Sequence, residues 1–514
     1  MTFLLALALL SAPPDVAVLR WSGPEGTAPL GFRDWAPGHA DWSIRTLHRT
    51  PGSFNDRVDV LVEDSLVAPL AAALDTLVAD LESESYNVGL YSVSGTVPES
   101  LRAFLQAEYD SGLVAAVFVG DLPVAWYQLI DDWNNNGIRE DDEHYEEFPC
   151  DLYYMDLNGT WQDTMKRYGN EDSLVPGADG IYDVHDGDVA PEIGISRMPA
   201  SAVGNEDSLI NAYLDRAHRY RDGRLAVTDR ALVYIDDDWI PNAWFWDRDV
   251  GLLYADRVSM WHQDSTRAAD YRPRMDSAAH ESVLLCAHSW PGGHVWTFAQ
   301  GDSHDRFYAH EIPQVDPEAC FYNLFACSNA RFVEPGNCGA RYVFETDHGL
   351  GAIGSAKTGS MLEFGDFYGP LANGYTLAGA FRYWFTVQAN GGYNRRERSW
   401  FYGMCLLGDG LLRPRLNVAV AEEPPGMTGS PRILSVSSPA RDEVSCAVSV
   451  RSPGRVTIAL LDCVGRVRER LHDGRLEPGT HRFKFRPASL PAGVWFLGVT
   501  TTGGSASSPV QVVR

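Results

Sequence analysis

Cysteine, positive charge and long hydrophobic runs are all scarce in this sequence. The chain has eight cysteines in 514 residues, too few for a disulfide-stapled scaffold. Lysine and arginine number 42 against 69 aspartates and glutamates, a formal charge of −27. Such an acidic surface repels phosphate backbones and anionic lipids, which argues against nucleic-acid binding and electrostatic membrane docking. No apolar run reaches the roughly 18 residues of a membrane span, so no transmembrane segment is expected.

Three common catalytic motifs are also missing. The sequence has no GxxxxGK[ST] phosphate loop, no HExxH zinc helix and no CxxC pair. With 45% hydrophobic and 11% aromatic residues, the chain is nevertheless typical of a globular protein. A nucleotide-binding or zinc-finger function is therefore disfavoured.

The N-terminus has the pattern of a secretory signal. An apolar run, Phe3–Leu10, is followed by small residues and a proline pair, which predicts a signal peptide over residues 1–12. The alternative is a buried first strand. Residues 13–56 form an N-terminal segment that we take as a possible pro-region. A secreted or cell-surface location follows from this interpretation.

From about Arg57 the sequence alternates strand and helix patterns. Short β-branched or fully apolar runs are separated by segments with apolar residues at helical spacing. Uninterrupted apolar strands are typical of a parallel sheet covered on both faces. We therefore expect a mostly parallel α/β domain over residues 57–418, with an Asp/Asn-rich insert at 130–190. A linker (419–430) and a small all-β, Ig-like sandwich (431–514) follow.

Two of the apolar strands are each followed at once by a reactive side chain. His288 follows the run Val283–Ala287, and Cys327 follows a run that ends at Ala326. The carboxyl ends of parallel strands share one rim, where catalytic groups gather. An imidazole that accepts a thiol proton produces a thiolate nucleophile and an imidazolium that can protonate a leaving amine. The pattern favours a Cys–His dyad; for either residue alone, a structural role is the alternative.

Together these stretches resemble the gingipain-type cysteine peptidases, relatives of the caspases and legumain. LLCAHSW contains His288 and FYNLFACSN contains Cys327; AAVFVGDLP, DLYYMDLNGTW, DVAPEIGISRMPAS and GLGAIGSAKTG add support. The resemblance implies a caspase-like fold and an endopeptidase that forms an acyl-enzyme on Cys327, with His288 as base and acid. Ser289 stands where the family has glycine. The backbone N–H groups of Ser289 and Cys327 are the expected oxyanion donors.

A third catalytic residue follows from the same resemblance. Family members orient the histidine with an upstream carboxylate, which points to Asp237 in the acidic triplet after the strand Ala231–Ile235. The triplet is equally compatible with a solvated loop or a metal site. His294 is a second candidate for the general base.

The acidic insert contains a calcium-loop pattern. Counted from Asp132, oxygen-bearing side chains fall at positions 1, 3, 5, 9 and 12, with glycine at position 6, which is the register of an EF-hand loop. The residues concerned are Asp132, Asn134, Asn136, Glu140 and Glu143. No flanking helices are evident. The pattern predicts either a structural Ca²⁺ site in another setting or a plain Asn/Asp-rich surface loop.

The C-terminal region resembles a second family. GRVTIALLDCVGRV, EPGTHRFKF and LPAGVWFLGV are similar to FlgD-like and type IX secretion sorting domains. This resemblance implies secretion machinery as a partner of residues 431–514. A stalk or carbohydrate-facing Ig-like module is the alternative.

Three functions remain open at this point. The leading hypothesis is a secreted or cell-surface cysteine endopeptidase that acts on proteins or peptides. The second is a catalytically decayed, calcium-stabilised surface binding or structural protein on a peptidase fold, which the substitution at Ser289 keeps open. The third is a metal-dependent hydrolase that uses the histidines between residues 288 and 310.

Overall fold

The structure is a computed structural model that describes residues 15–35, 41–51, 56–299 and 303–414, together with seven segments near the C-terminus. Those segments are 432–436, 444–450, 454–461, 466–476, 479–486, 493–501 and 504–512. The predicted signal peptide (1–12) and linker (419–430) lie outside the described residues. The chain forms two compact units, one of residues 1–369 and 376–417, the other of residues 370–375 and 418–514.

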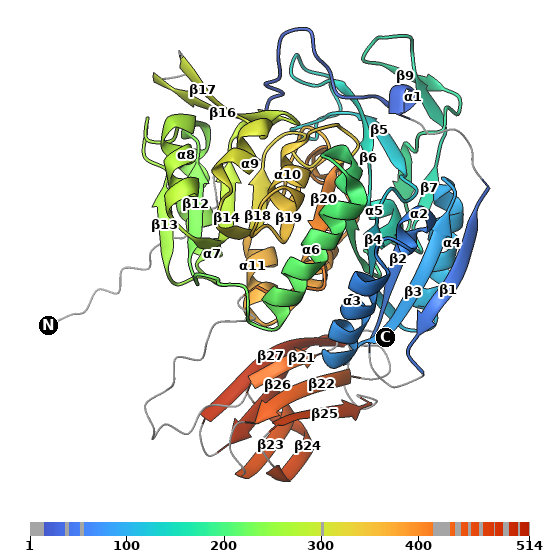
Figure 1. Cartoon of the computed structure of the whole chain (residues 1–514), viewed down its shortest axis with the longest axis vertical. Coiled ribbons are helices and arrows are strands. Elements are labelled where there is room, and N and C mark those ends of the chain that lie inside the picture. Colours follow the sequence, from blue (N-terminus) through green and yellow to red (C-terminus); the bar gives the residue numbers. More distant parts are fainter. Residues whose placement is uncertain are drawn as a thin grey trace, which may run out of the picture. The chain divides into compact units, whose positions relative to one another are not determined.

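The larger unit is built on an eleven-stranded sheet with the order β1-β3-β2-β4-β11-β20-β19-β18-β14-β12-β13 (Figure 1). Neighbours are parallel from β3 to β11 and again from β19 to β13. β20 is antiparallel to β19, and the edge strand β1 is antiparallel to β3. The strands are β1 (Ser43–Arg49), β2 (Arg57–Glu63), β3 (Asn87–Ser94), β4 (Leu113–Val119), β11 (Gly194–Met198), β12 (Ala231–Ile235), β13 (Arg257–Met260), β14 (His280–Cys286), β18 (Ala319–Phe325), β19 (Gly351–Ser355) and β20 (Met404–Gly408).

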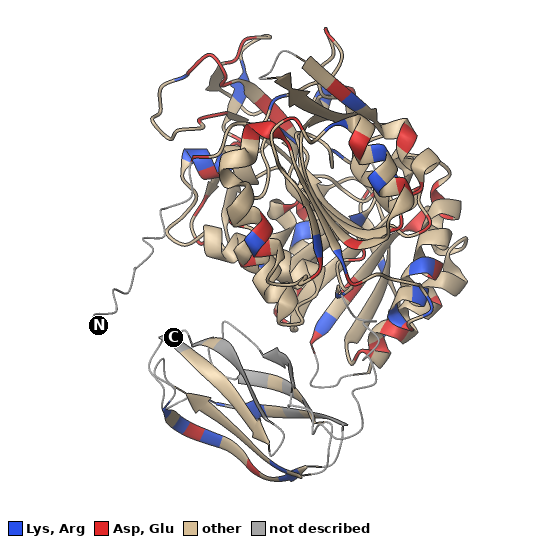
Figure 2. Ribbon diagram, turned by 90° about the vertical axis from the view of Figure 1, so that its left-hand side faces the viewer, with Lys and Arg blue, Asp and Glu red and all other residues tan. Residues whose placement is uncertain are grey.

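Helices lie on both faces of this sheet, and the charged residues are found mainly on helices and loops (Figure 2). The longer helices are α3 (Ala71–Ser83), α4 (Pro98–Tyr109), α6 (Glu206–Arg221), α7 (Ile240–Val250), α8 (Ala268–Ser277), α11 (Gly365–Ala372) and α12 (Leu377–Gln388). α4 begins at a proline, and the Asn205 side chain caps α6 by accepting from the Ser208 N–H. The predicted mostly parallel α/β fold flanked by helices is confirmed.

The acidic region predicted as an insert folds into short hairpins. They are β5 (Trp126–Ile130) with β6 (Tyr145–Pro149), β7 (Thr160–Gln162) with β10 (Val184–Asp186), and β8 (Met165–Arg167) with β9 (Leu174–Pro176). The short helix α5 (Leu152–Met155) is completely buried. The aromatic side chains of α5 pack against the sheet, with the rings of Tyr154 and Phe118 on β4 5.5 Å apart.

A buried ion pair joins α5 to the sheet. Asp151 precedes α5, and its carboxylate accepts from Arg197 Nε on β11 at 2.7 and 2.9 Å. Arg197 also donates to the Pro123 carbonyl at 3.1 Å and lies 4.9 Å from the rings of Phe118 and Phe332. Burial raises the pKa of Asp151, whereas the Arg197 guanidinium opposes that rise. The pair therefore needs both partners.

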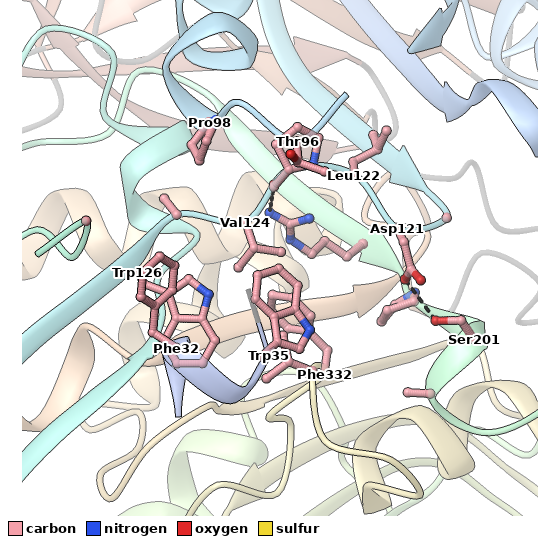
Figure 3. A pocket seen from close by; sticks show the side chains of 18 of the residues that line it. Phe32, Trp35, Thr96, Pro98, Asp121, Leu122, Val124, Trp126, Ser201 and Phe332 are labelled. Carbon is pink, nitrogen blue, oxygen red and sulfur yellow. Dashed lines mark hydrogen bonds between the residues drawn. The ribbon is translucent and has the colours of Figure 1, made fainter. Parts of the chain in front are cut away.

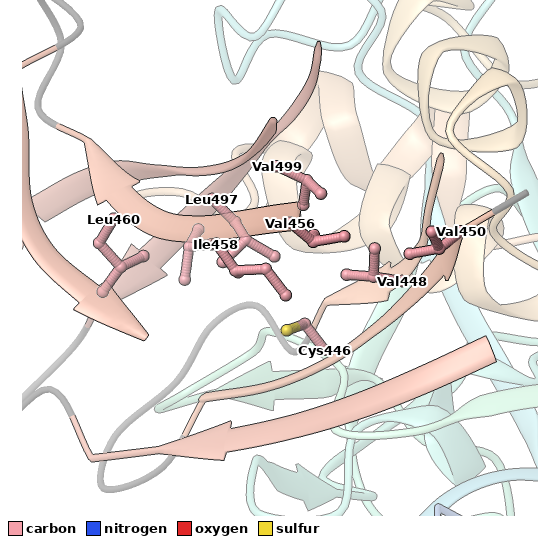
Figure 4. Close-up of a cluster of buried hydrophobic side chains, with 9 residues drawn as sticks. Cys446, Val448, Val450, Val456, Ile458, Leu460, Leu497 and Val499 are labelled. Carbon is pink, nitrogen blue, oxygen red and sulfur yellow. The ribbon is translucent and has the colours of Figure 1, made fainter. Parts of the chain in front are cut away.

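The smaller unit contains two antiparallel sheets, β21-β22-β25 and β24-β23-β26-β27. The strands are β21 (Arg432–Val436), β22 (Val444–Val450), β23 (Gly454–Leu461), β24 (Val467–Leu476), β25 (Gly479–Phe485), β26 (Gly493–Thr501) and β27 (Gly504–Val512). Val448 from one sheet and Ile458, Leu497 and Val499 from the other share a single core (Figure 4). This arrangement is the two-layer β architecture that the turn-rich sequence predicts.

Among the described residues, no helix combines the length and apolar character needed to cross a bilayer.

Replacing Arg197 with methionine is expected to destabilise the larger unit by about 3–5 kcal/mol, because Asp151 would remain buried without its partner. Arg230→Ala serves as the matched control, since its pair with Asp256 is at the surface and is worth less than about 1 kcal/mol. Urea denaturation of both variants measures the difference. Equal effects of the two substitutions would contradict the role assigned to the buried pair.

Candidate active site

The register between β14 and β18 brings the two predicted catalytic residues to one rim. The strands are parallel, and Cys286 pairs with Phe325. The Ala287 N–H then donates to the Phe325 carbonyl at 3.1 Å. His288 and Cys327 each follow their paired residue by two positions, so they leave neighbouring strands at the same level. A second contact links them, because Ser289 Oγ donates to the Cys327 carbonyl at 2.8 Å.

Both ring nitrogens of His288 have hydrogen-bond partners. Nε2 lies 2.7 Å from Asp238 Oδ2, and Nδ1 accepts from the backbone N–H of Arg20 at 3.1 Å. An acceptor at Nδ1 places the proton of the neutral imidazole on Nε2, which donates to Asp238. The hydrogen bond from His288 lowers the pKa of Asp238, so this carboxylate is ionised near neutral pH. The ring of Trp239 lies 4.8 Å from the imidazole and limits its rotation.

The carboxylate beside the histidine is one position later than predicted. Asp237 accepts from the Asp264 N–H at 2.8 Å and does not bond to His288, which corrects the prediction that it orients the ring. A 3₁₀ turn over Asp237–Trp239 rotates successive side chains by about a third of a turn, and Asp238 is the one that faces the imidazole. Asp236 is completely buried, where it accepts from the N–H of Thr297 at 3.0 Å. Burial raises the pKa of Asp236 to about 7.

Cys327 lies in a closed environment. Its side chain is completely buried, and this burial raises the pKa of the thiol. Contacts with the Gly359 amide, the Thr358 side chain and Lys357 oppose the rise, whereas Glu146 adds to it. In this state the thiol is protonated at neutral pH and shielded from solvent. A thiol in this environment becomes a nucleophile only when it is deprotonated and exposed to a reactant.

The residue after the cysteine has an unusual backbone. Ser328 has a φ of 50°, in the left-handed region that non-glycine residues rarely adopt, and its N–H donates to the Lys357 carbonyl at 2.9 Å. Such positions cost about 1–3 kcal/mol and cluster at functional sites. The sharp turn directs the chain away from the strand immediately after Cys327.

Lys357 and Glu146, which both act on the Cys327 thiol, belong to a buried ion cluster. Lys357 Nζ lies 2.9 Å from Asp131 Oδ1 and 2.7 Å from Glu146 Oε2, and it donates to the Ser399 carbonyl at 2.8 Å. Burial by itself lowers the pKa of Lys357, but the two carboxylates more than offset this, so the pKa lies above its ordinary value. The cluster ties the β5–β6 hairpin to the loop that follows β19.

Residues 15–35, called here the cover segment, cross the rim in front of His288. The Trp239 indole donates to the Ala17 carbonyl at 2.8 Å, and the Ser22 N–H donates to the Ser289 carbonyl at 3.0 Å. Trp21 forms a parallel bridge with Ser289, which lies in β15 (His288–Trp290). The cover segment therefore pairs with the histidine's own strand in extended form, as a bound peptide does.

Further along, the cover segment closes one wall of a pocket of about 720 Å³ (Figure 3). Phe32 and Trp35 of α1 (Phe32–Trp35) face Trp126, with ring centroids 5.7 and 5.6 Å away. Phe332, from the loop that follows Cys327, contributes another aromatic wall. The Leu30 carbonyl accepts from Arg331 at 2.7 Å, which fixes this part of the segment to the same loop.

Comparison with known families decides the assignment. The model of peptidase family C25 matches residues 64–415, which include both strand ends described above.

The chain belongs to peptidase family C25.

This family, the gingipain family, consists of cysteine peptidases, and the match confirms the predicted resemblance of the α/β domain. No curated protein matches the sequence significantly. Among solved structures, the sulfur carrier protein SoxY from Chlorobium limicola f thiosulfatophilum is 17% identical, with 16% of this chain and 79% of that chain covered and a TM-score of 0.13. The endo-beta-1,4-mannanase from Thermotoga petrophila is 10% identical, with 60% and 71% covered and a TM-score of 0.16. Likenesses at these TM-scores carry no structural argument.

In this C25 chain the second histidine candidate has another role. His294 is completely buried on β16 (Gly293–Phe298), and its Nε2 lies 3.1 Å from the Tyr342 hydroxyl. Burial lowers its pKa to about 3. The ring stacks on Phe307 and Tyr342. His294 is therefore a neutral core residue in this structure.

The predicted calcium-loop residues lie together in the loop between β5 and β6. Asp132 accepts from the N–H groups of Asn136 and Gly137 at 3.1 and 2.9 Å. Glu143 accepts from those of Trp133 and Glu140, both at 2.9 Å. The remaining predicted ligands form local contacts: Asn134 Oδ1 lies 3.0 Å from the Asn136 N–H, and Asn136 Nδ2 lies 3.1 Å from Glu140 Oε1. The carboxylates of Asp132 and Glu143 thus hold the two ends of the loop together. The side chains of the loop offer mainly oxygen atoms, which are the ligands that Ca²⁺ prefers.

Sequence reasoning missed several residues around the site. The acidic triplet that contains Asp238 is visible in the sequence, but the sequence does not show which of its side chains the 3₁₀ turn directs toward His288. The sequence pattern does not point to Lys357 or Glu146, because they reach Cys327 from distant segments, the loop after β19 and strand β6. Arg20 acts through its backbone N–H, which no side-chain pattern reports.

Proposed function

We propose that this C25 family member is a cysteine endopeptidase in which Cys327 is the nucleophile and His288 the general base and acid. The observation that supports it best is the pairing of β14 with β18, which carries the two residues to the same level of one rim. The bond from Nε2 to Asp238 leaves the Nδ1 lone pair as the group that accepts the thiol proton.

The reaction then follows from these groups. Transfer of the thiol proton to His288 Nδ1 gives a thiolate that attacks the peptide carbonyl carbon. The backbone N–H groups of Ser289 and Cys327 are the proposed donors to the resulting oxyanion. The imidazolium gives its proton to the leaving amine as the C–N bond breaks, which leaves an acyl-enzyme. Water activated by the neutral imidazole hydrolyses the thioester. Asp238 acts as a positioning residue that holds the proton on Nε2.

Cleavage of a mixed peptide library tests the dyad and its positioning residue. Cys327→Ala should abolish turnover, and Asp238→Asn should lower kcat by about 10²–10⁴-fold, because an amide donor favours the wrong imidazole tautomer. Asp237→Asn is the matched control and should stay within about threefold of the wild type.

Other outcomes of that experiment point to the other functions. Turnover by both the wild type and Cys327→Ala would assign the chemistry to another residue or to a metal. If neither the folded wild type nor variants with the cover segment released cleaved any peptide, the catalytically decayed binding or structural protein would be favoured.

We also propose that the N-terminal region (13–56) acts as a pro-region through the cover segment. Arg20 donates to the nitrogen that the reaction needs as a base, and Leu19 beside it is only 2% exposed. A segment bound in this way competes with peptide substrates for the edge of β15. Proteolysis or displacement of the segment would then free His288.

Leu19→Asp is expected to raise kcat/KM for a short peptide by about tenfold or more, because a buried leucine is worth about 2–3 kcal/mol and the charge releases the segment. Glu25→Ala, an exposed change on the same segment, is the control. The rate of iodoacetamide alkylation at Cys327, followed by mass spectrometry, should rise in parallel. Unchanged rates in Leu19→Asp would contradict a blocking role.

A structural calcium ion in the loop Asp132–Glu143 is proposed from the oxygen ligands and their register. Calcium at about 100 times its Kd should stabilise the chain by about 2.7 kcal/mol, seen as a rise in Tm. Glu143→Gln should remove most of this gain, whereas the exposed neighbour Asp141→Asn should keep it. An equal response of the two variants to calcium would contradict the site.

We also propose that the protein is exported from the cell. A secreted or cell-surface location is supported by the family and by the signal-like N-terminus, and the sandwich of residues 431–514 is proposed as the part that secretion machinery recognises. Proteins and peptides are the proposed substrates.

A further inference from the structure

Beside the dyad, three side chains converge in the way that metal ligands do. Asp236, Asp238 and His288 each offer one ligand atom, and these atoms lie within 4.8 Å of one another. In the part of the chain that the structure describes, no other group of three or more His, Cys, Asp or Glu side chains converges like this. The backbone holds the group in place, because Ile235 pairs with Cys286 and the Asp236 N–H donates to the Cys286 carbonyl at 3.0 Å.

The donor set suits a zinc-type ion. One imidazole and two carboxylates leave a fourth, open position for water in a tetrahedral site. His288 Nε2 and Asp238 Oδ2 are 2.7 Å apart, so both reach one ion at about 2.0–2.2 Å with a narrow angle between them. Asp236 is completely buried, whereas 43% of the Asp238 side chain is exposed, so an ion has a way in. Calcium needs about six to eight oxygen ligands and does not suit an imidazole.

We propose that Asp236, Asp238 and His288 bind a divalent transition-metal ion such as Zn²⁺, and that this ion switches the peptidase off. The evidence for the binding site is the geometry of these three side chains, and it does not depend on the proposed function. The inhibitory effect rests on the proposed function, because it acts through the dyad's base.

The inhibition follows from which nitrogen of the His288 imidazole carries the proton. Without metal, Nε2 carries the proton and Nδ1 has the free lone pair. Metal binding at Nε2 displaces that proton, so the one proton of a neutral imidazole must then reside on Nδ1. A protonated Nδ1 accepts nothing from the Cys327 thiol. The ion therefore removes the general base without touching the nucleophile.

By the same argument, the ion and the cover segment compete for His288. In this structure the Arg20 N–H donates to Nδ1 of His288, which requires the lone pair that metal binding removes. The positive charge of Arg20, which helps to lower the pKa of Asp238, also opposes a cation electrostatically. Metal binding and docking of Arg20 on His288 are thus mutually exclusive. A variant that releases the cover segment binds the ion more tightly.

Titration calorimetry on the full chain tests the site directly. In the Leu19→Asp background, where the cover segment is released, ZnCl₂ should bind with a component that Asp236→Asn weakens by at least about tenfold and His288→Ala abolishes. Asp237→Asn is the matched control and should keep this component, since Asp237 bonds to Asp264 instead. Asp236→Asn retains an oxygen for the Thr297 N–H, and its Tm is measured to verify folding. Identical zinc isotherms for the Leu19→Asp chain and for folded Leu19→Asp/Asp236→Asn, both with the cover segment released, would overturn the proposal, as would tight binding of CaCl₂ by the same three residues.

An activity assay separates this proposal from the proposed function. Zinc should inhibit peptide cleavage by the wild type over the concentration range in which it binds, and a chelator should reverse the effect. Asp236→Asn should be about tenfold less sensitive while its metal-free activity is unchanged. Zinc binding that needs Asp236 in a chain with no peptidase activity would sustain the metal site and refute the proposed function. Equal inhibition of the two forms would refute the switch and leave the peptidase intact.

Discussion

The parallel pairing of β14 with β18 is the constraint on which the rest of the candidate site depends. It aligns His288 with Cys327, and the neighbouring pairing of β12 with β14 brings the acidic triplet to the same rim. Because backbone hydrogen bonds fix these registers, a one-residue slip in either strand would turn the side chain concerned to the opposite face. The arrangement of the candidate site thus depends on apolar strand residues that lie in the core of the sheet.

Two buried ion clusters hold the acidic insert against this sheet. Arg197 binds Asp151, and Lys357 binds Asp131 and Glu146. In each case the cation comes from the sheet or its loops and the carboxylates come from the insert. Charges buried in this way stabilise little by themselves, but the loss of one partner is costly. They therefore specify where the insert docks, and Glu146 thereby reaches the surroundings of Cys327.

The periodic patterns of the sequence predict strands and helices well, whereas the orientation of side chains in short turns cannot be predicted from it. Apolar runs and helical spacing predicted the α/β sheet, and the strand ends predicted His288 and Cys327 as neighbours. Asp237 was chosen over Asp238 because a sequence does not report the phase of a short 3₁₀ turn. The sequence does not predict the complete burial of Cys327, and the groups that act on its thiol come from β6, which carries Glu146, and from residues 357–359. Contacts made by backbone groups, such as the Arg20 N–H, leave no trace in residue identity.

The sheet order has a consequence for how the cover segment is held. β1, which follows this segment in the chain, is an edge strand, whereas β14 lies near the other edge of the eleven-stranded sheet. The segment is thus a tethered ligand, present at its site at an effective concentration set by the connection to β1. One cut between Ser22 and Ser43 leaves every contact with His288 in place yet turns the segment into a separate peptide. Its occupancy then falls with dilution, so in the proposed pro-region the cleavage of one bond would convert a permanent block into a concentration-dependent one.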